Sequence, residues 1–201
     1  KIMLFKLTLI TPLLITVWDT NVGIYKAAAL NLAVIFGAHE GLLRAHSKRF
    51  WNELVNTLYD VLVAKQRSDP NVNSDVATKV KEGLEDTLQI IANALSFRED
   101  KLDLLNATGS EKLLDGLMQA YLLDRDQQNY MSRELQVLTA LTQEFQQQKD
   151  AKDRVSKHLE QSSAVQQFFE FVSSQTTTSA DELTFTAIAC MKNLLLLMVF
   201  F

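Results

Sequence analysis

The stretch "LNLAVIFGAHEGLLRA", residues 30 to 45, carries one asparagine inside an apolar run, stops at a glycine and continues in further apolar residues. The chain repeats this pattern as "ANALSFREDKLDLLNA", residues 92 to 107. In both stretches apolar residues recur at the three- and four-residue spacing of a helix face. Gly37 lies where a left-handed C-cap residue is favoured, because glycine adopts a positive φ without a steric penalty. Each stretch therefore predicts a long helix, a tight corner and a second helix.

The two stretches align without a gap over about thirty positions when Asn93 is placed on Asn31. The aligned pairs keep apolar side chains: Leu43 with Leu105, Ala45 with Ala107, Trp51 with Leu113, and Val55 with Leu117. A third copy begins at "LQVLTALTQEF" (135–145) and a fourth at "FTAIACMKNLLLL" (185–197). The sequence thus contains an internal repeat, with intervals of about 62, 47 and 53 residues.

These intervals and the composition define the expected fold. Armadillo and HEAT repeats are helical units of roughly 40 to 47 residues, and an inserted polar loop at residues 66–75 lengthens the first interval. The chain has six Gly and two Pro among 201 residues, which favours helix over sheet. We therefore predict an all-α protein, a right-handed α-solenoid of about three to four armadillo/HEAT-like repeats.

The chain is expected to form a single armadillo-like repeat domain over residues 1–201 and to be a fragment of a larger protein. Its predicted sections are residues 20–74, 75–125, 126–178 and 179–201, after helices in 1–19 that belong to a preceding partial repeat. The expected helices are 20–36, 39–46, 48–65, 75–97, 100–107, 110–124, 129–147, 150–160, 163–174 and one from about 180. "TGSE" (108–111) and "SADE" (179–182) have the capping-box pattern at the start of a helix.

The N-terminal run "KIMLFKLTLITPLLITVW", residues 1 to 18, allows two interpretations. It is apolar enough for a targeting or membrane segment, but Lys6, four threonines and Pro12 interrupt it. The alternative is a helix that ends near Ile10, followed by a helix with Thr11 as N-cap and Pro12 at its first position. The second interpretation agrees with the helical repeat, so we expect no membrane contact.

Residues for catalysis, metal binding or nucleic-acid binding are sparse. The net charge is −4 and the basic residues are interleaved with acids, which argues against a nucleic-acid partner. His39, His46 and His158 lack metal-ligand spacing, and we expect them at the surface or at helix ends. Cys190 lies on an apolar helix, where a free cysteine acts as a small hydrophobe, and a single cysteine forms no internal disulfide. We expect no enzyme activity, no cofactor and no metal, and a cytoplasmic location.

Three asparagines are candidate binding residues. Asn31, Asn93 and Asn193 fall at corresponding places in the long helix of their copies. In armadillo-type repeats the matching asparagine can project into a concave groove and hydrogen-bond the backbone of an extended peptide. Alternatively, each asparagine satisfies a neighbouring carbonyl or faces water at the edge of the apolar stripe. The third copy carries Thr139 and Thr142 in this region, so a continuous asparagine ladder is not expected.

Two adjacent aromatic residues, Phe168 and Phe169, are further candidates for partner binding. Neighbouring side chains cannot face the same side of a helix, so we expect one of the two rings to be partly exposed. Most of the aromatic residues are expected in the core, but an exposed ring is a plausible anchor for a partner.

The segment "LNLAVIFGAHEGLLRA", followed by a helix, a polar loop and "LEDTLQIIANALSFREDKLDLLNATGSEKLLDGLM" (84–118), resembles the rotatin and fly anastral spindle family. The resemblance covers roughly residues 25 to 141 and corresponds to the armadillo-like C-terminal region of these centriole and basal-body proteins. It implies a scaffold that binds other centriolar proteins in centriole assembly and elongation, located at the centrosome.

Together these features predict a non-catalytic, protein-binding scaffold whose partner is a centriolar peptide or helix. Self-association through exposed terminal helices is a second expected contact, because residues 183–201 are apolar nearly all round the helix. The alternative function is a generic armadillo/HEAT adaptor that binds an extended peptide or a helix in transport or trafficking.

Overall fold

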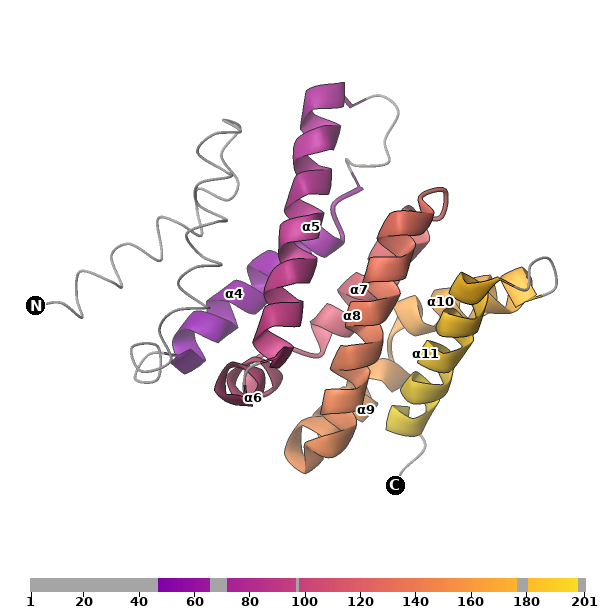
Figure 1. Ribbon diagram of the computed structural model, residues 1–201. Helices are drawn as coiled ribbons and strands as arrows, with labels where there is room; N and C mark the ends of the chain where they lie inside the picture. The colour runs from indigo at the N-terminus through magenta and orange to yellow at the C-terminus, as the bar shows by residue number, and fades with distance from the viewer. Residues whose placement is uncertain (1–46, 66–71, 97, 177–180, 199–201) are drawn as a thin grey trace, which may run out of the picture. The chain divides into compact units, whose positions relative to one another are not determined.

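The computed structural model describes residues 47–65, 72–96, 98–176 and 181–198 (Figure 1). This part of the chain consists of helices joined by turns and contains no strand, which confirms the all-α prediction there. Several predicted features lie outside the described residues: the helices in 1–46, the corner at Gly37, Asn31, His39 and His46.

The chain divides into two compact units, Lys1–Ala107 and Thr108–Phe201. The first contains α4 (Ser47–Leu62), α5 (Ser74–Ser96) and α6 (Arg98–Asn106), and these three helices pack against one another. On α5 the buried residues recur at helical spacing, as in Leu84, Leu88 and Ile91, so one face of the helix is apolar and enclosed. The fully buried side chains of α4 include Trp51, Val55 and Leu62.

The second unit contains α7 (Lys112–Leu123), α8 (Gln128–Gln147), α9 (Lys149–Glu160), α10 (Ser163–Thr176) and α11 (Glu182–Met198). Helix α8 packs against α11, and in Figure 1 the two lie side by side and run in the same direction. Helix α7 packs against α10, and α9 packs against both α8 and α11. Within this unit, then, α7 and α8 each pack against the helix that comes three places later in the chain.

The described helices lie close to the positions expected from the sequence. Each begins and ends within about three residues of its predicted bounds, which is the usual uncertainty at helix ends. Connections in the second unit are short. Gln148, for example, is the single residue between α8 and α9, and its extended backbone (φ −105°, ψ 97°) turns the chain between the two helices.

The segment between α6 and α7 differs from the predicted capping box. Helix α7 follows "TGSE" but begins at Lys112, after a turn, and its N-cap residue Glu111 makes no side-chain cap hydrogen bond. In that turn the Lys112 N–H donates to the Gly109 carbonyl at 2.9 Å, and Gly109 has a φ of 83°. A side chain with a Cβ is disfavoured at such an angle, so glycine is the favoured residue in this turn. At α11 the cap is Asp181, whose Oδ1 accepts from the Thr184 N–H at 2.8 Å.

Candidate functional site

The structure places two of the three candidate asparagines. Asn93 lies half-buried on α5, where its Oδ1 accepts a hydrogen bond from Gln89 Nε2 of the same helix at 2.8 Å. Asn193 lies half-buried on α11, and its backbone carbonyl accepts from Gln146 Nε2 of α8 at 2.9 Å. Both side chains are partly accessible, and their role in peptide binding stays a prediction.

The two adjacent phenylalanines on α10 face different environments, as predicted. Phe168 is 0% exposed, and its ring lies edge-on to Tyr121 of α7 with centroids 5.3 Å apart. Phe169 is partly exposed. Phe168 is therefore a core residue, and of the two Phe169 is the one available to a partner.

A row of exposed apolar side chains runs along α11. Phe185 is 63% exposed, Ile188 41% and Leu195 44%. With the exposed Lys192 they stand at i, i+3, i+7 and i+10, so they share one face of the helix, which we call the α11 stripe. The opposite face is buried through Ala187, Cys190, Leu194 and Leu197. Large apolar side chains that are exposed together on one face mark an interaction surface more often than isolated ones do.

The single cysteine is enclosed by the packing of α11. Cys190 is fully buried, and burial raises the pKa of its thiol to about 12, although the nearby side chain of Thr139 acts in the opposite direction. A thiol with this pKa stays protonated near neutral pH, and the thiolate is the nucleophilic form. Cys190 is therefore a packing residue, in agreement with the sequence.

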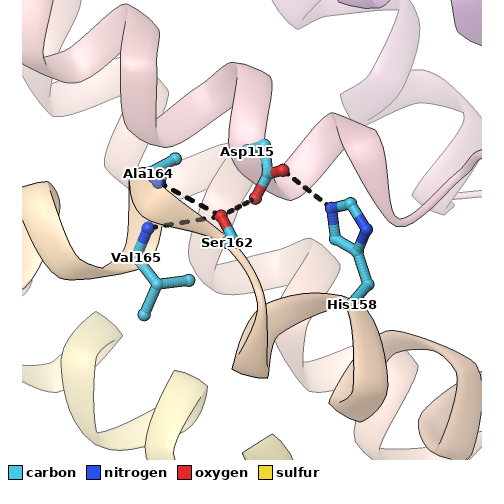
Figure 2. A network of polar contacts seen from close by, with 5 residues as sticks. All are labelled: Asp115, His158, Ser162, Ala164 and Val165. Atoms are coloured by element: carbon cyan, nitrogen blue, oxygen red, sulfur yellow. Dashed lines mark hydrogen bonds and ion pairs between the residues drawn. The ribbon is translucent and has the colours of Figure 1, made fainter.

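A cluster of polar side chains joins three helical segments of the second unit (Figure 2). Asp115, in the first turn of α7, contacts His158 in the last turn of α9, with 2.7 Å between Oδ2 and Nε2. The hydroxyl of Ser162 donates to the other carboxylate oxygen, Oδ1, at 2.6 Å. Ser162 precedes α10, and its Oγ also accepts from the backbone N–H groups of Ala164 and Val165 at 3.2 and 3.4 Å. One carboxylate thus holds the end of α9 and the N-cap of α10 against α7.

A second ion pair lies one helical turn away. Arg154 Nε lies 3.0 Å from Glu111 Oε2, and Arg154 Nη2 donates to Ser110 Oγ at 2.9 Å. Arg154 and His158 are four residues apart on α9, and Glu111 and Asp115 have the same spacing on the other side, so the two pairs match in register. Acidic groups at the start of α7 and basic groups near the end of α9 also complement the helix dipoles.

The order of groups in this cluster determines its chemistry. In a catalytic triad the imidazole lies between the carboxylate and the serine hydroxyl and takes the hydroxyl proton. Here the Asp115 carboxylate lies between His158 and Ser162, and the Ser162 hydroxyl is engaged as a helix cap. The arrangement is that of a structural clamp between helices.

The clamp alters the titration of its histidine. The hydrogen bond to Asp115 raises the pKa of His158 above its usual value of about 6.5, with further support from the charges of Asp115 and Glu111. Burial and the neighbouring Lys112 act in the opposite direction without cancelling the increase. The protonated imidazole is therefore the form that the folded unit favours.

Tyr121 of α7 is a further side chain whose pKa is shifted. Burial, together with the charges of Asp181, Glu134 and Cys190, raises the pKa of its phenol to about 12. The phenol stays neutral near pH 7 and packs between the Phe168 ring and the Phe171 ring, whose centroid lies 5.8 Å away.

Within the described ranges, His, Cys, Asp and Glu side chains nowhere gather in a group of three or more that could hold a metal ion. None of the described helices combines the length and the apolar character needed to cross a membrane. Comparisons with protein-family models, with curated proteins and with solved structures give no match to this chain.

Sequence reasoning placed His158 at a helix end but missed its partner. Asp115 lies 43 residues away, and a contact between helices is set by packing that spacing alone does not define. A weak signal was present in the sequence. Glu111 and Asp115 are two acids four residues apart, and Arg154 and His158 are two bases with the same spacing, so the acidic pair can match the basic pair.

Proposed function

We propose that this chain is a non-catalytic helical scaffold that binds other proteins, and that the α11 stripe is part of its binding surface. The single observation that carries this proposal is the alignment of Phe185, Ile188 and Leu195 on one exposed helix face. Their removal from water supplies the free energy of association, at about 25 cal/mol for each Å² of apolar surface buried. Phe169, partly exposed on α10, is a candidate second anchor.

We further propose that the helices belong to a right-handed solenoid of armadillo/HEAT-like repeats. The packing of α8 on α11 and of α7 on α10 supports it, because stacked three-helix repeats bring equivalent helices together. The matching asparagines on α5 and α11, Asn93 and Asn193, are then candidate groove residues.

For the cellular role, we propose a scaffold in centriole or basal-body assembly, on the basis of the resemblance of residues 25–141 to the rotatin and anastral spindle family. The second candidate is an armadillo/HEAT adaptor in transport or trafficking. An exposed apolar helix face suits a partner helix in either role.

The test is proximity labelling in dividing cells with the tagged chain, comparing wild type with the double variant Phe185→Ser and Leu195→Ser. These side chains are exposed, so the variant is expected to fold, which circular dichroism of the purified proteins checks. Val76→Ser is the matched control, because Val76 is an apolar residue of similar exposure, 42%, on α5. We expect centriolar proteins to be labelled by wild type and by the control, and to be lost with the double variant.

Two other results are informative. Trafficking or cargo proteins in place of centriolar ones would favour the adaptor. Labelling that the α11 substitutions leave unchanged would exclude the stripe as the binding surface, and a further variant, Asn93→Ala with Asn193→Ala, then tests the groove.

A further inference from the structure

We propose that Phe185, Ile188 and Lys192 of the α11 stripe contact helix α11 of a second copy of this chain, with the two α11 helices antiparallel about a two-fold axis. This inference rests on the proposed function, because it names the partner of the same surface. In such a pairing each contact occurs twice, so the surface must be complementary to itself.

The charges on α11 fulfil that condition. Its 17 residues include one acid and one base, Glu182 and Lys192, and both are exposed. They lie equally far from the level of Ala187, about 7.5 Å along the helix axis on either side. An antiparallel pair with its axis at that level brings Glu182 of each copy beside Lys192 of the other. A parallel pair would instead place like charges together, which is unfavourable.

The apolar side chains fit the same arrangement. Phe185 and Ile188 flank the level of the axis, so they lie at the centre of the pair, where exclusion of water is most complete. The axis also brings Phe185 opposite Ala189 of the second copy. Ala189 is small and exposed, which leaves room for the ring.

The charge of Lys192 restricts the occupants that fit the stripe. An entirely apolar partner would remove the ammonium group from water without compensation, which is costly. A second copy supplies the carboxylate of Glu182 at the required position. Because one helix face buries less than the roughly 1,200 Å² of a stable interface, we expect a weak dimer with a Kd of roughly micromolar order.

The experiment is sedimentation velocity over a concentration series with the full 201-residue chain. Wild type is compared with Lys192→Glu, with Glu182→Lys and with the double reversal that carries both changes. Each single reversal places like charges side by side and is expected to weaken association by about tenfold or more. The double reversal restores opposite pairs and is expected to return to within about threefold of wild type.

Four controls accompany the series. Circular dichroism and thermal unfolding show whether the variants keep the fold, as expected for exposed positions. Phe185→Ser, which leaves both charges in place, is expected to abolish the dimer, and Val76→Ser to leave it unchanged. Higher salt is expected to weaken wild type and the double reversal alike.

A wild type that stays monomeric across the series overturns the inference, and so does a double reversal that associates no better than the single ones. These failures are distinct from failure of the proposed function. Suppose that wild type is monomeric in sedimentation, but that the Phe185→Ser and Leu195→Ser double variant no longer labels the partners that wild type labels. The stripe then binds a different protein and not a second copy. If the charge reversals behave as expected but labelling is unchanged by that double variant, the self-pairing stands and the proposed role of the stripe in binding other proteins falls.

Discussion

Asp115 accepts two hydrogen bonds from side chains that belong to different segments, and one of these donors, Ser162, also caps α10. A hydrogen bond that involves a charged group contributes about 1.5 to 3 kcal/mol to stability, compared with about 0.5 to 1.5 kcal/mol for a neutral one. A carboxylate shared in this way links the start of one helix to the position of two others.

The first prediction concerns the replacement Asp115→Asn, which keeps the shape of the side chain and removes its charge. We expect the free energy of unfolding to fall by about 1 to 3 kcal/mol near pH 6, measured by urea denaturation. Asp153→Asn is the control, because it makes the same change at an exposed position on α9. Equal losses for the two variants would show that the clamp does not stabilise the fold.

The second prediction is a pH dependence. The pKa of His158 is raised in the folded state, so the protonated imidazole adds to the free energy of unfolding. This stabilisation is fully present below the unfolded pKa of about 6.5 and declines as pH rises through the folded pKa. The stability difference between wild type and Asp115→Asn should therefore be larger near pH 6 than near pH 8.5. NMR titration of His158 measures the cause directly: its pKa is expected to lie above about 6.5 in wild type and to fall in Asp115→Asn. An imidazole pKa that the substitution leaves unchanged would contradict this explanation.

At the scale of the helix, two successive residues of α10 lie in different environments, one in the core and one partly at the surface. Phe168 is enclosed beside Tyr121, whereas Phe169 is partly exposed. The sequence predicted this difference from helix geometry, but it did not say which of the two rings is buried. That choice depends on which face of α10 packs against α7, and packing between distant segments is invisible in the local pattern.

The third prediction follows from this contrast. Phe168→Ala leaves a cavity in the core, and we expect a loss of about 3 to 5 kcal/mol in the free energy of unfolding. Phe169→Ala removes a partly exposed ring and should cost about 1 kcal/mol. Thermal and urea unfolding of the two variants, followed by circular dichroism, measure both values. The interpretation would be wrong if the two substitutions were equally destabilising.

The fourth prediction concerns the turn before α7. Gly109→Ala places a Cβ on a residue with a φ of 83° and is expected to destabilise by about 1 to 2 kcal/mol. Gly109→Asn should cost less, because asparagine tolerates this backbone region better than alanine does. The same unfolding measurements order the three proteins, and an alanine variant as stable as wild type would show that the turn has another conformation.

At the scale of the whole chain, apolar spacing and polar breaks predicted the described helices well, because both are local signals. They could not predict the Asp115–His158 contact, nor the side chains that α11 leaves exposed, since both depend on how helices distant in the sequence pack. The capping box before α7 was also wrong, because the pattern at 108–111 competes with a turn that Gly109 permits.

The fifth prediction uses the division into two units. Both tryptophans, Trp18 and Trp51, lie within Lys1–Ala107, so tryptophan fluorescence follows the first unit while circular dichroism follows both. Phe168→Ala weakens the core of the second unit, and we expect it to shift the urea midpoint seen by circular dichroism more than the fluorescence midpoint. Coincident transitions in this variant would show instead that the chain unfolds as one cooperative body.

The burial of Cys190 makes its reaction with thiol reagents a measure of how often α11 opens. The chain has one cysteine, and α11 holds it out of reach of solvent, so a thiol reagent modifies the protein when that helix separates from its neighbours. The rate of alkylation in excess reagent therefore reports how often α11 opens, without any engineered probe. A ligand that binds to α11 and holds it in place should slow the reaction in proportion to its occupancy.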